Sequence, residues 1–224
     1  MKKIMKETME IVFILDRSGS MAGLEQDTIG GFNGLIEKQK REASSARVSL
    51  VLFDDRTEVI LDRVPIEDIG SLSEEEYYVR GSTALWDAVG RSVLHIARVH
   101  QKMKAENRPE KTLFIITTDG MENSSVEYSL DQVKQLIERQ KERDHWEFLF
   151  LGANIDAVPT AGSMGIGASR AVNFHEDKPG MRKNFGILAR AMKLYEESEE
   201  LDENWAEDIR KDFESREQED RFSK

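Results

Sequence analysis

The chain has 224 residues, enough for one α/β domain with a buried core, and its net charge is −11. It contains no cysteine, so disulfides, thiolate metal sites and cysteine nucleophiles are excluded. No apolar run reaches the ~18 residues of a membrane span, and the run at residues 11–15 is too short for a secretory signal. We therefore expect a cytoplasmic protein without membrane contact.

Five short apolar runs predict strands, and they lie at residues 11–15, 48–53, 113–118, 148–151 and 171–174. The first four are almost continuously hydrophobic, as expected for strands buried on both faces of a sheet, whereas the last is weak. A sixth strand is predicted at residues 57–64. Only Asp54, Asp55 and Arg56 join it to the strand before it, so these two strands should form an antiparallel hairpin.

Helical periodicity fills the gaps between the strands. Apolar residues three or four positions apart predict three helices, around residues 29–36, 85–97 and 130–137. Ser129, followed three residues later by Gln132, forms a capping-box pattern that should begin the third helix. Pro179 is typical of the first turn of a further helix, whose apolar stripe continues to Tyr195.

The elements follow one another as β-α-ββ-α-β-α-β-short α-β-α. This alternation predicts an α/β fold: a doubly wound, mostly parallel sheet of about six strands, with one antiparallel edge strand and helices on both faces. The long connection at residues 65–82 carries few structural signals, and such connections are often functional. We assign residues 1–195 to this domain.

The composition changes after residue 195. Residues 196–224 carry 13 acidic and 5 basic residues, whereas the rest of the chain is close to neutral. Neither part has the clusters of Lys and Arg that bind a phosphate backbone, so we expect no nucleic-acid binding.

Within this acidic tail an apolar residue recurs at every fourth position, at Leu201, Trp205, Ile209 and Phe213. The spacing would suit a narrow amphipathic helix. Because charge runs usually stay solvated, we expect a solvated extension of the last helix, and deletion of residues 202–224 should leave the fold intact. A docking helix for a partner is the alternative.

Polar residues follow two of the predicted strands. Asp16-Arg17-Ser18-Gly19-Ser20 comes directly after the first strand, and Asp119-Gly120 comes after the strand at residues 113–118. Each segment alone is an ordinary turn sequence. In a doubly wound sheet, however, the loops after these two strands diverge at the switch point, where ligands bind. The two aspartates should lie side by side there, and a divalent cation would relieve their repulsion.

Carboxylate and hydroxyl oxygens suit Mg²⁺ or Mn²⁺ rather than Zn²⁺. Together with Gly81-Ser82-Thr83-Ala84-Leu85, these segments resemble the metal-ion-dependent adhesion site (MIDAS) of von Willebrand factor A (VWA) domains. In that family Asp-x-Ser-x-Ser is followed by a Thr and then by an Asp. The residues that match are Asp16, Ser18, Ser20, Thr83 and Asp119. The resemblance covers residues 11–195, and residues 148–156 also look like stand-alone bacterial VWA proteins.

The resemblance implies how such a site would work. Ser18, Ser20 and sometimes Thr83 would contact the metal, whereas Asp16 and Asp119 would act mainly through water. With few anions bound to it directly, the cation would stay electrophilic. An open coordination position would then accept an Asp or Glu carboxylate from a protein partner. We therefore expect a Mg²⁺- or Mn²⁺-dependent protein-binding module and not an enzyme.

Two other functions remain open. A Mg²⁺-dependent hydrolase or phosphatase on a Rossmann-like sheet could use Asp16 as its nucleophile, although the second carboxylate expected two residues later is replaced by Ser18. A scaffold whose metal serves only stability is the other alternative. The sequence names neither the partner nor the oligomeric state.

Three further signals concern binding. Gly165-x-Gly167 lacks a third glycine and precedes a strand, so dinucleotide binding is not expected. Tyr77, Tyr78 and Arg80 would either rim the metal site or pack the long loop. The histidines lack zinc spacing and are expected at surface or cap positions, at His95, His100, His145 and His175.

Overall fold

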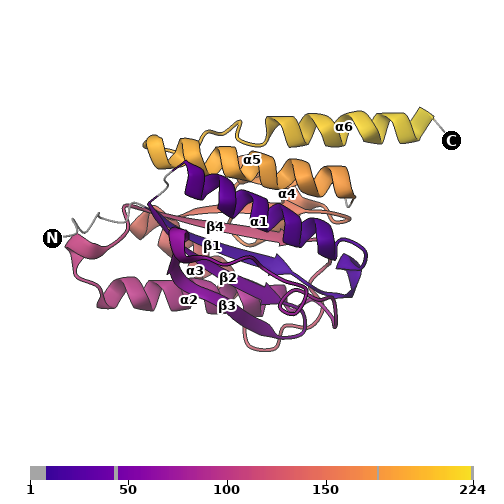
Figure 1. Cartoon of the computed structure of the whole chain (residues 1–224). Coiled ribbons are helices and arrows are strands. Elements are labelled where there is room, and N and C mark those ends of the chain that lie inside the picture. Colours follow the sequence, from indigo (N-terminus) through magenta and orange to yellow (C-terminus); the bar gives the residue numbers. More distant parts are fainter. Residues whose placement is uncertain (1–8, 43–44, 176, 223–224) are drawn as a thin grey trace.

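The structure, a computed structural model of the chain, describes residues 9–42, 45–175 and 177–222. These residues form a six-stranded sheet, with β1 (Met9–Asp16), β2 (Ala46–Phe53), β3 (Thr57–Pro65), β4 (Lys111–Thr118), β5 (Glu147–Gly152) and β6 (Ala171–Asn173). The order across the sheet is β3-β2-β1-β4-β5-β6, and every neighbouring pair is parallel except β2 and β3. The predicted fold, a doubly wound sheet with one antiparallel edge strand, is confirmed (Figure 1).

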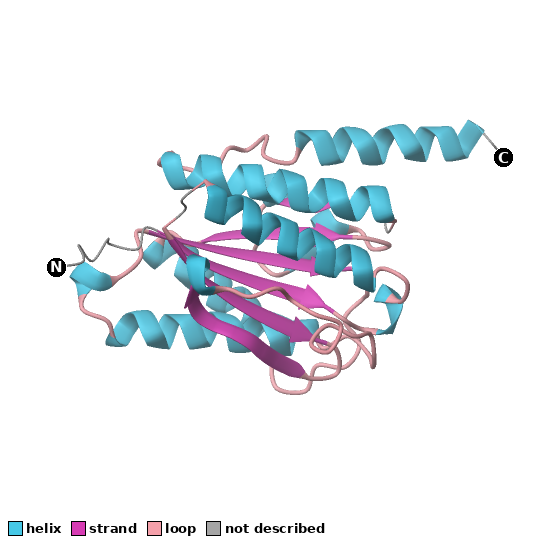
Figure 2. Ribbon diagram, in the orientation of Figure 1, coloured by secondary structure: helices cyan, strands magenta, loops and turns pink. Residues whose placement is uncertain are grey.

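Helices lie on both faces of the sheet (Figure 2). One face carries α1 (Glu25–Arg41) and α5 (Lys178–Glu197), and the other carries α2 (Leu85–Lys102), α3 (Leu130–Asp144) and α4 (Ala157–Ser163). A separate helix, α6 (Glu207–Phe222), follows α5. Short 3-10 helices also occur in the described chain, namely η1 (Gly19–Met21), η2 (Ile66–Asp68), η3 (Ala105–Asn107) and η4 (Ala168–Arg170).

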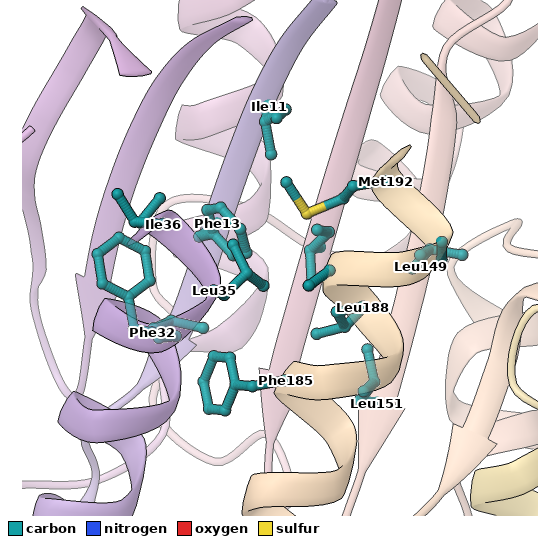
Figure 3. Close-up of a cluster of buried hydrophobic side chains, with 14 of the residues drawn as sticks. Ile11, Phe13, Phe32, Leu35, Ile36, Leu149, Leu151, Phe185, Leu188 and Met192 are labelled. Carbon is teal, nitrogen blue, oxygen red and sulfur yellow. The ribbon is translucent and has the colours of Figure 1, made fainter. Parts of the chain in front are cut away.

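The central strand β1 contributes to the hydrophobic core on both sides of the sheet. Successive side chains of a strand point to opposite faces. Accordingly, Ile11 and Phe13 pack beneath α1 and α5, whereas Val12 and Ile14 pack beneath α2 and α3. Figure 3 shows the first of these clusters, in which Phe13 meets Phe32 of α1 edge to face, with ring centroids 5.3 Å apart. Burial on both faces explains why β1 reads as a continuous apolar run.

The predicted helix starts are confirmed by their hydrogen bonds. At α3, the Ser129 hydroxyl accepts from the Gln132 backbone N–H, and the Gln132 side chain accepts from the Ser129 N–H. This reciprocal pair satisfies two amides that lack partners within the helix. At α5, the Asp177 side chain accepts from the Gly180 N–H at 2.7 Å, and Pro179 lies in the first turn.

The segment after α5 packs on the domain, so the expectation of a solvated tail is wrong. Leu201, Trp205 and Ile209 are each less than a tenth exposed and belong to the core cluster beneath α5. The Trp205 indole N–H donates to the carbonyl of Ser169 at 3.0 Å. Three of the four residues in the spacing seen in the sequence are therefore buried, whereas Phe213 is partly exposed and stacks on the His175 ring. Within the described residues, no helix is long and apolar enough to cross a membrane.

One histidine also departs from expectation. His100, near the end of α2, is buried rather than at the surface. Its Nε2 lies 3.3 Å from a carboxylate oxygen of Glu10, and its ring meets the Trp146 ring edge to face. The aromatic and acidic neighbours explain how a polar ring is accommodated at the end of the sheet. His145 matches expectation, since it ends α3 in the left-handed conformation.

The buried segment yields a stability prediction. Because Ile209 is 2% exposed, Ile209→Ala should lower the free energy of unfolding by about 2–5 kcal/mol in urea denaturation. Glu214→Ala, at an exposed position of the same helix, should change it by less than about 0.5 kcal/mol. Deletion of residues 202–224 should destabilise the protein at least as much as Ile209→Ala. Equal stability of the deleted and full chains would contradict the packing of α6.

Candidate metal centre

The candidate site lies where β1 and β4 end. These strands are neighbours and run parallel, with Leu15 paired to Thr117, so Asp16 and Asp119 leave the sheet at the same edge. Beyond this point the chain turns toward β2 on one side and toward β5 on the other. The predicted switch point is therefore present, and both aspartates are almost fully buried there.

The two strand ends are joined by a chain of short polar contacts. The hydroxyls of Ser18 and Ser20 are 3.0 Å apart, and the Ser20 hydroxyl donates to Asp119 Oδ1 at 2.6 Å. On the other side, Asp16 Oδ1 accepts from the Ser18 backbone N–H at 2.7 Å. Asp16 Oδ2 accepts from the hydroxyl of Thr118, the last residue of β4, at 2.5 Å. Residues 99 or more positions apart in sequence thus share one polar cluster.

Thr83 reaches this cluster from the loop that precedes α2. Its hydroxyl lies so close to Gly120 that a Cβ at that glycine would be 2.7 Å from Thr83 Oγ1 and 3.2 Å from Ser20 Oγ. A backbone hydrogen bond also joins the β1 loop to the loop that carries Thr83, because the Gly19 N–H donates to the carbonyl of Gly81 at 3.1 Å. The structure therefore brings all five predicted residues together. Ser20 alone among them is exposed, which leaves the cluster open to solvent on that side.

Burial makes the negative charge of Asp16 unfavourable. The pKa of this carboxyl is raised from 3.8 to about 6, chiefly because burial removes water from around it, with a smaller contribution from the charge of Asp119. Hydrogen bonds from Ser18 and Thr118 oppose this shift but do not cancel it. Without metal, the carboxyl of Asp16 therefore ionises at a cost next to a second buried aspartate, and a cation would relieve this cost.

An ionic network centred on the buried Arg17, which no local sequence signal indicates, supports the β1 loop. Arg17 is 0% exposed, although it lies between two site residues. Its guanidinium donates to Asp54 at 2.9 Å and to Glu58 at 2.6 Å. Arg80 donates to the same oxygen of Asp54 at 2.7 Å. Burial opposes ionisation of Asp54, but hydrogen bonds from its neighbours, Arg80 foremost, hold its pKa below the usual value.

The two tyrosines upstream of Thr83 have different roles. Tyr77 is fully buried, and its hydroxyl donates to the backbone carbonyl of Asp16 at 2.6 Å. Tyr78 is 42% exposed, and the guanidinium carbons of Arg17 and Arg80 lie 5.2 and 5.3 Å from its ring centroid. The packing role expected from the sequence is therefore confirmed for Tyr77, and a place at the rim of the metal site stays a prediction for Tyr78. Tyr77 packs the long loop, and Tyr78 lies at the surface beside Arg17.

The donors present fit a hard divalent cation. The described residues contain no group of three or more His, Cys, Asp and Glu side chains that could hold a metal ion. The cluster instead combines two carboxylates with the hydroxyls of Ser18, Ser20 and Thr83. Every donor is an oxygen, as Mg²⁺ and Mn²⁺ prefer, and no sulfur or imidazole nitrogen favours Zn²⁺.

Comparison with known proteins identifies the family of the domain. The sequence matches the family model of the von Willebrand factor type A domain over residues 10–175. A search of the curated proteins finds no match.

Several solved structures resemble the fold. A von Willebrand factor type A protein from Catenulispora acidiphila has a TM-score of 0.54 at 14% identity, over 83% of this chain and 42% of that one. The PilB minor pilin from Streptococcus sanguinis has a TM-score of 0.57 at 11% identity, over 84% of this chain and 62% of the pilin. The vWF domain of the pili tip protein Mfa5 from Porphyromonas gingivalis has a TM-score of 0.59 at 8% identity, over 88% of this chain and 99% of that domain. Identities this low support a shared fold alone.

The raised pKa of Asp16 predicts a pH dependence of stability. Between pH 3.8 and about 6 the unfolded chain has lost this proton while the metal-free folded protein keeps it. The stabilising contribution of this carboxyl to the free energy of unfolding is therefore fully present below pH 3.8. It is lost, by about 3 kcal/mol, as the pH rises through 6. Asp16→Asn should abolish this fall, since the amide carries no charge.

Urea denaturation in EDTA at several pH values measures the difference in the free energy of unfolding between wild type and Asp16→Asn. The two proteins should be similar near pH 4, and the variant should be the more stable above pH 6. If the free energies of unfolding of the two proteins changed in parallel over this pH range, the raised pKa of Asp16 would be contradicted.

Proposed function

The chain belongs to the von Willebrand factor type A family, and on that premise we propose that it is a metal-dependent protein-binding module with a MIDAS-type site. The single observation that carries the proposal is the convergence of Ser18, Ser20 and Asp119 in one hydrogen-bonded cluster, with the Thr83 hydroxyl against Gly120. The domain match itself supports an interaction module. The metal and its use are our proposal.

The serine and threonine hydroxyls would hold Mg²⁺ or Mn²⁺, and Asp16 and Asp119 would orient water around it. When bound, the cation would supply an electrophilic coordination position for an Asp or Glu carboxylate of a protein partner. The chain's own residues determine access to that position. Ser20 is exposed, whereas Asp16 is enclosed by its contacts with Ser18 and Thr118.

Exposed side chains beside the cluster would add contacts with the partner. Met121, two residues beyond Asp119, is 73% exposed. Tyr78, in the long loop before Thr83, is 42% exposed, and its ring is in contact with the guanidinium groups of Arg17 and Arg80. Aromatic and methionine side chains are common at binding surfaces because they offer large contact areas. The partner would therefore carry an acidic residue flanked by apolar groups.

The two alternative functions are less well supported. A hydrolase would need Asp16 free to attack, but both of its carboxylate oxygens accept hydrogen bonds and the side chain is 1% exposed. A metal with a purely structural role would be enclosed, as closed structural zinc sites are, whereas the exposure of Ser20 leaves this cluster open. We therefore propose no enzymatic activity. The cytoplasmic location stays a prediction from the sequence.

Metal binding is expected to stabilise the fold. At a hundredfold excess over its Kd, Mg²⁺ or Mn²⁺ should raise the free energy of unfolding by about 2.7 kcal/mol, because only the folded chain has the site. Gly120→Ala should abolish most of this response, since the new methyl would displace the Thr83 hydroxyl. Gly34→Ala, whose added methyl meets open space on α1, is the matched control and should respond like wild type. A wild-type melting curve that is indifferent to millimolar Mg²⁺ and Mn²⁺ would rule out the site.

Partner binding is expected to require the metal. In capture experiments from the native cell, partners retained in Mg²⁺ should be lost in EDTA and lost again with Ser18→Ala or Asp119→Ala. Both variants should keep the native circular dichroism spectrum. For a purified partner, changing its critical Asp or Glu to the amide should weaken binding about as much as Asp119→Ala, because a neutral oxygen is a poorer ligand for a hard cation. Equal binding in EDTA and in Mg²⁺ would locate the partner surface elsewhere.

A further inference from the structure

We propose that Asn123 is the positioning residue for Thr83: it ties the loop that carries Asp119 to the loop that carries Thr83, so that both reach the metal as one preformed unit. This inference rests on the proposed function. Asn123 is not one of the five residues that match the MIDAS pattern. It would link the last two of them, Thr83 and Asp119, through the loop that carries Asp119.

Asn123 and Thr83 form a reciprocal pair of hydrogen bonds. The Thr83 backbone N–H donates to the side-chain oxygen of Asn123 at 3.0 Å. The Asn123 backbone N–H donates to the carbonyl of Thr83 at 3.0 Å. Both backbone groups of Thr83 are thus held by one residue from the other loop, 40 positions away. A residue held at both its N–H and its C=O has little freedom to move its side chain relative to its partner segment.

The rest of the β4–α3 loop is attached to the start of α2. A carboxylate oxygen of Glu122 accepts from the Trp86 N–H at 3.0 Å, and the Ser125 hydroxyl accepts from the Asp87 N–H at 3.1 Å. These amides lie in the first turn of the helix, where no intrahelical carbonyl can accept from them. The loop therefore supplies the hydrogen bonds that the helix start requires.

The reverse contacts come from Asp87. Its carboxylate accepts three successive backbone N–H groups of the loop, at 2.9, 2.9 and 2.8 Å, from Val126, Glu127 and Tyr128. The loop and the helix start therefore hold each other in both directions. Asn123 lies between Glu122 and Ser125 in this attachment and is the member that contacts a candidate metal residue.

Asn123 is suited to experiment because its side chain is exposed. Substitution should not open a cavity in the core, and the bond from its backbone N–H to Thr83 does not depend on the side chain. Asn123→Ala removes only the side-chain acceptor. Asn123→Asp keeps an acceptor oxygen at the same place and is the conservative rescue.

The test is calorimetric titration of the full chain with Mn²⁺, without a partner. Asn123→Ala should weaken Mn²⁺ binding about tenfold, the lower end of the effect of removing residues that orient metal ligands. Asn123→Asp should bind at least as tightly as wild type. In a Thr83→Ala background, adding Asn123→Ala should weaken Mn²⁺ binding by less than a further twofold, because the effect of Asn123 passes through Thr83. Val126→Ala, at a 90% exposed position of the same loop, should match wild type.

Hydrogen exchange in EDTA gives a readout that needs no metal. The Thr83 amide should exchange at least tenfold faster in Asn123→Ala than in wild type, and at the wild-type rate in Asn123→Asp. If Asn123 served only general stability, Asn123→Ala and Asn123→Asp would lower the melting temperature alike. The losses of Mn²⁺ affinity caused by Asn123→Ala and Thr83→Ala would then be additive in the double variant.

Several results would overturn the inference while leaving the proposed function intact. These are Mn²⁺ affinity of Asn123→Ala within twofold of wild type, an undiminished cost of Asn123→Ala in the Thr83→Ala background, unchanged exchange of the Thr83 amide, or failure of Asn123→Asp to restore binding. Absence of Mn²⁺ binding to the wild-type chain would instead refute the proposed function, and this inference with it.

Discussion

The close approach of two buried carboxylates at the ends of adjacent parallel strands is the constraint on which the rest of the site depends. β1 and β4 run in register, so Asp16 and Asp119 cannot separate without disturbing the centre of the sheet. Burial raises the cost of their charge, as the elevated pKa of Asp16 indicates. The surrounding hydroxyls and amides reduce that cost but add no positive charge. A bound cation would supply the positive charge that compensates the two carboxylates.

The positive charges nearest the cluster are engaged elsewhere. Arg17, although adjacent to Asp16 in sequence, faces Asp54 and Glu58, and Arg80 shares the Asp54 carboxylate. This network ties the β2–β3 hairpin and the long loop to the β1 loop. Tyr77 adds a hydrogen bond from its hydroxyl to the Asp16 carbonyl. Basic residues thus shape the site without neutralising it, which would preserve its affinity for a metal ion.

Much of the fold could be predicted because its signals are local. Continuous apolar runs identified strands buried on both faces, and the three-residue link before Thr57 identified the antiparallel edge. The candidate site followed from placing Asp16 and Asp119 at one switch point. The burial of Leu201, Trp205 and Ile209 could not be predicted, since a four-residue spacing does not say which surface the side chains meet. Likewise, nothing local distinguishes Tyr77 from Tyr78 or reveals that Asn123 reaches Thr83.

The central claim, a cation bound by these oxygens with a position open to a partner, is tested most directly by the water-proton relaxation of bound Mn²⁺. The relaxation rate reports whether exchangeable water remains on the metal. The account predicts one Mn²⁺ per chain, enhanced relaxation from rapidly exchanging water, and a decrease in that enhancement when a partner carboxylate binds. Mn²⁺ bound without exchangeable water, or the same enhancement in an Asp119→Ala variant, would contradict it.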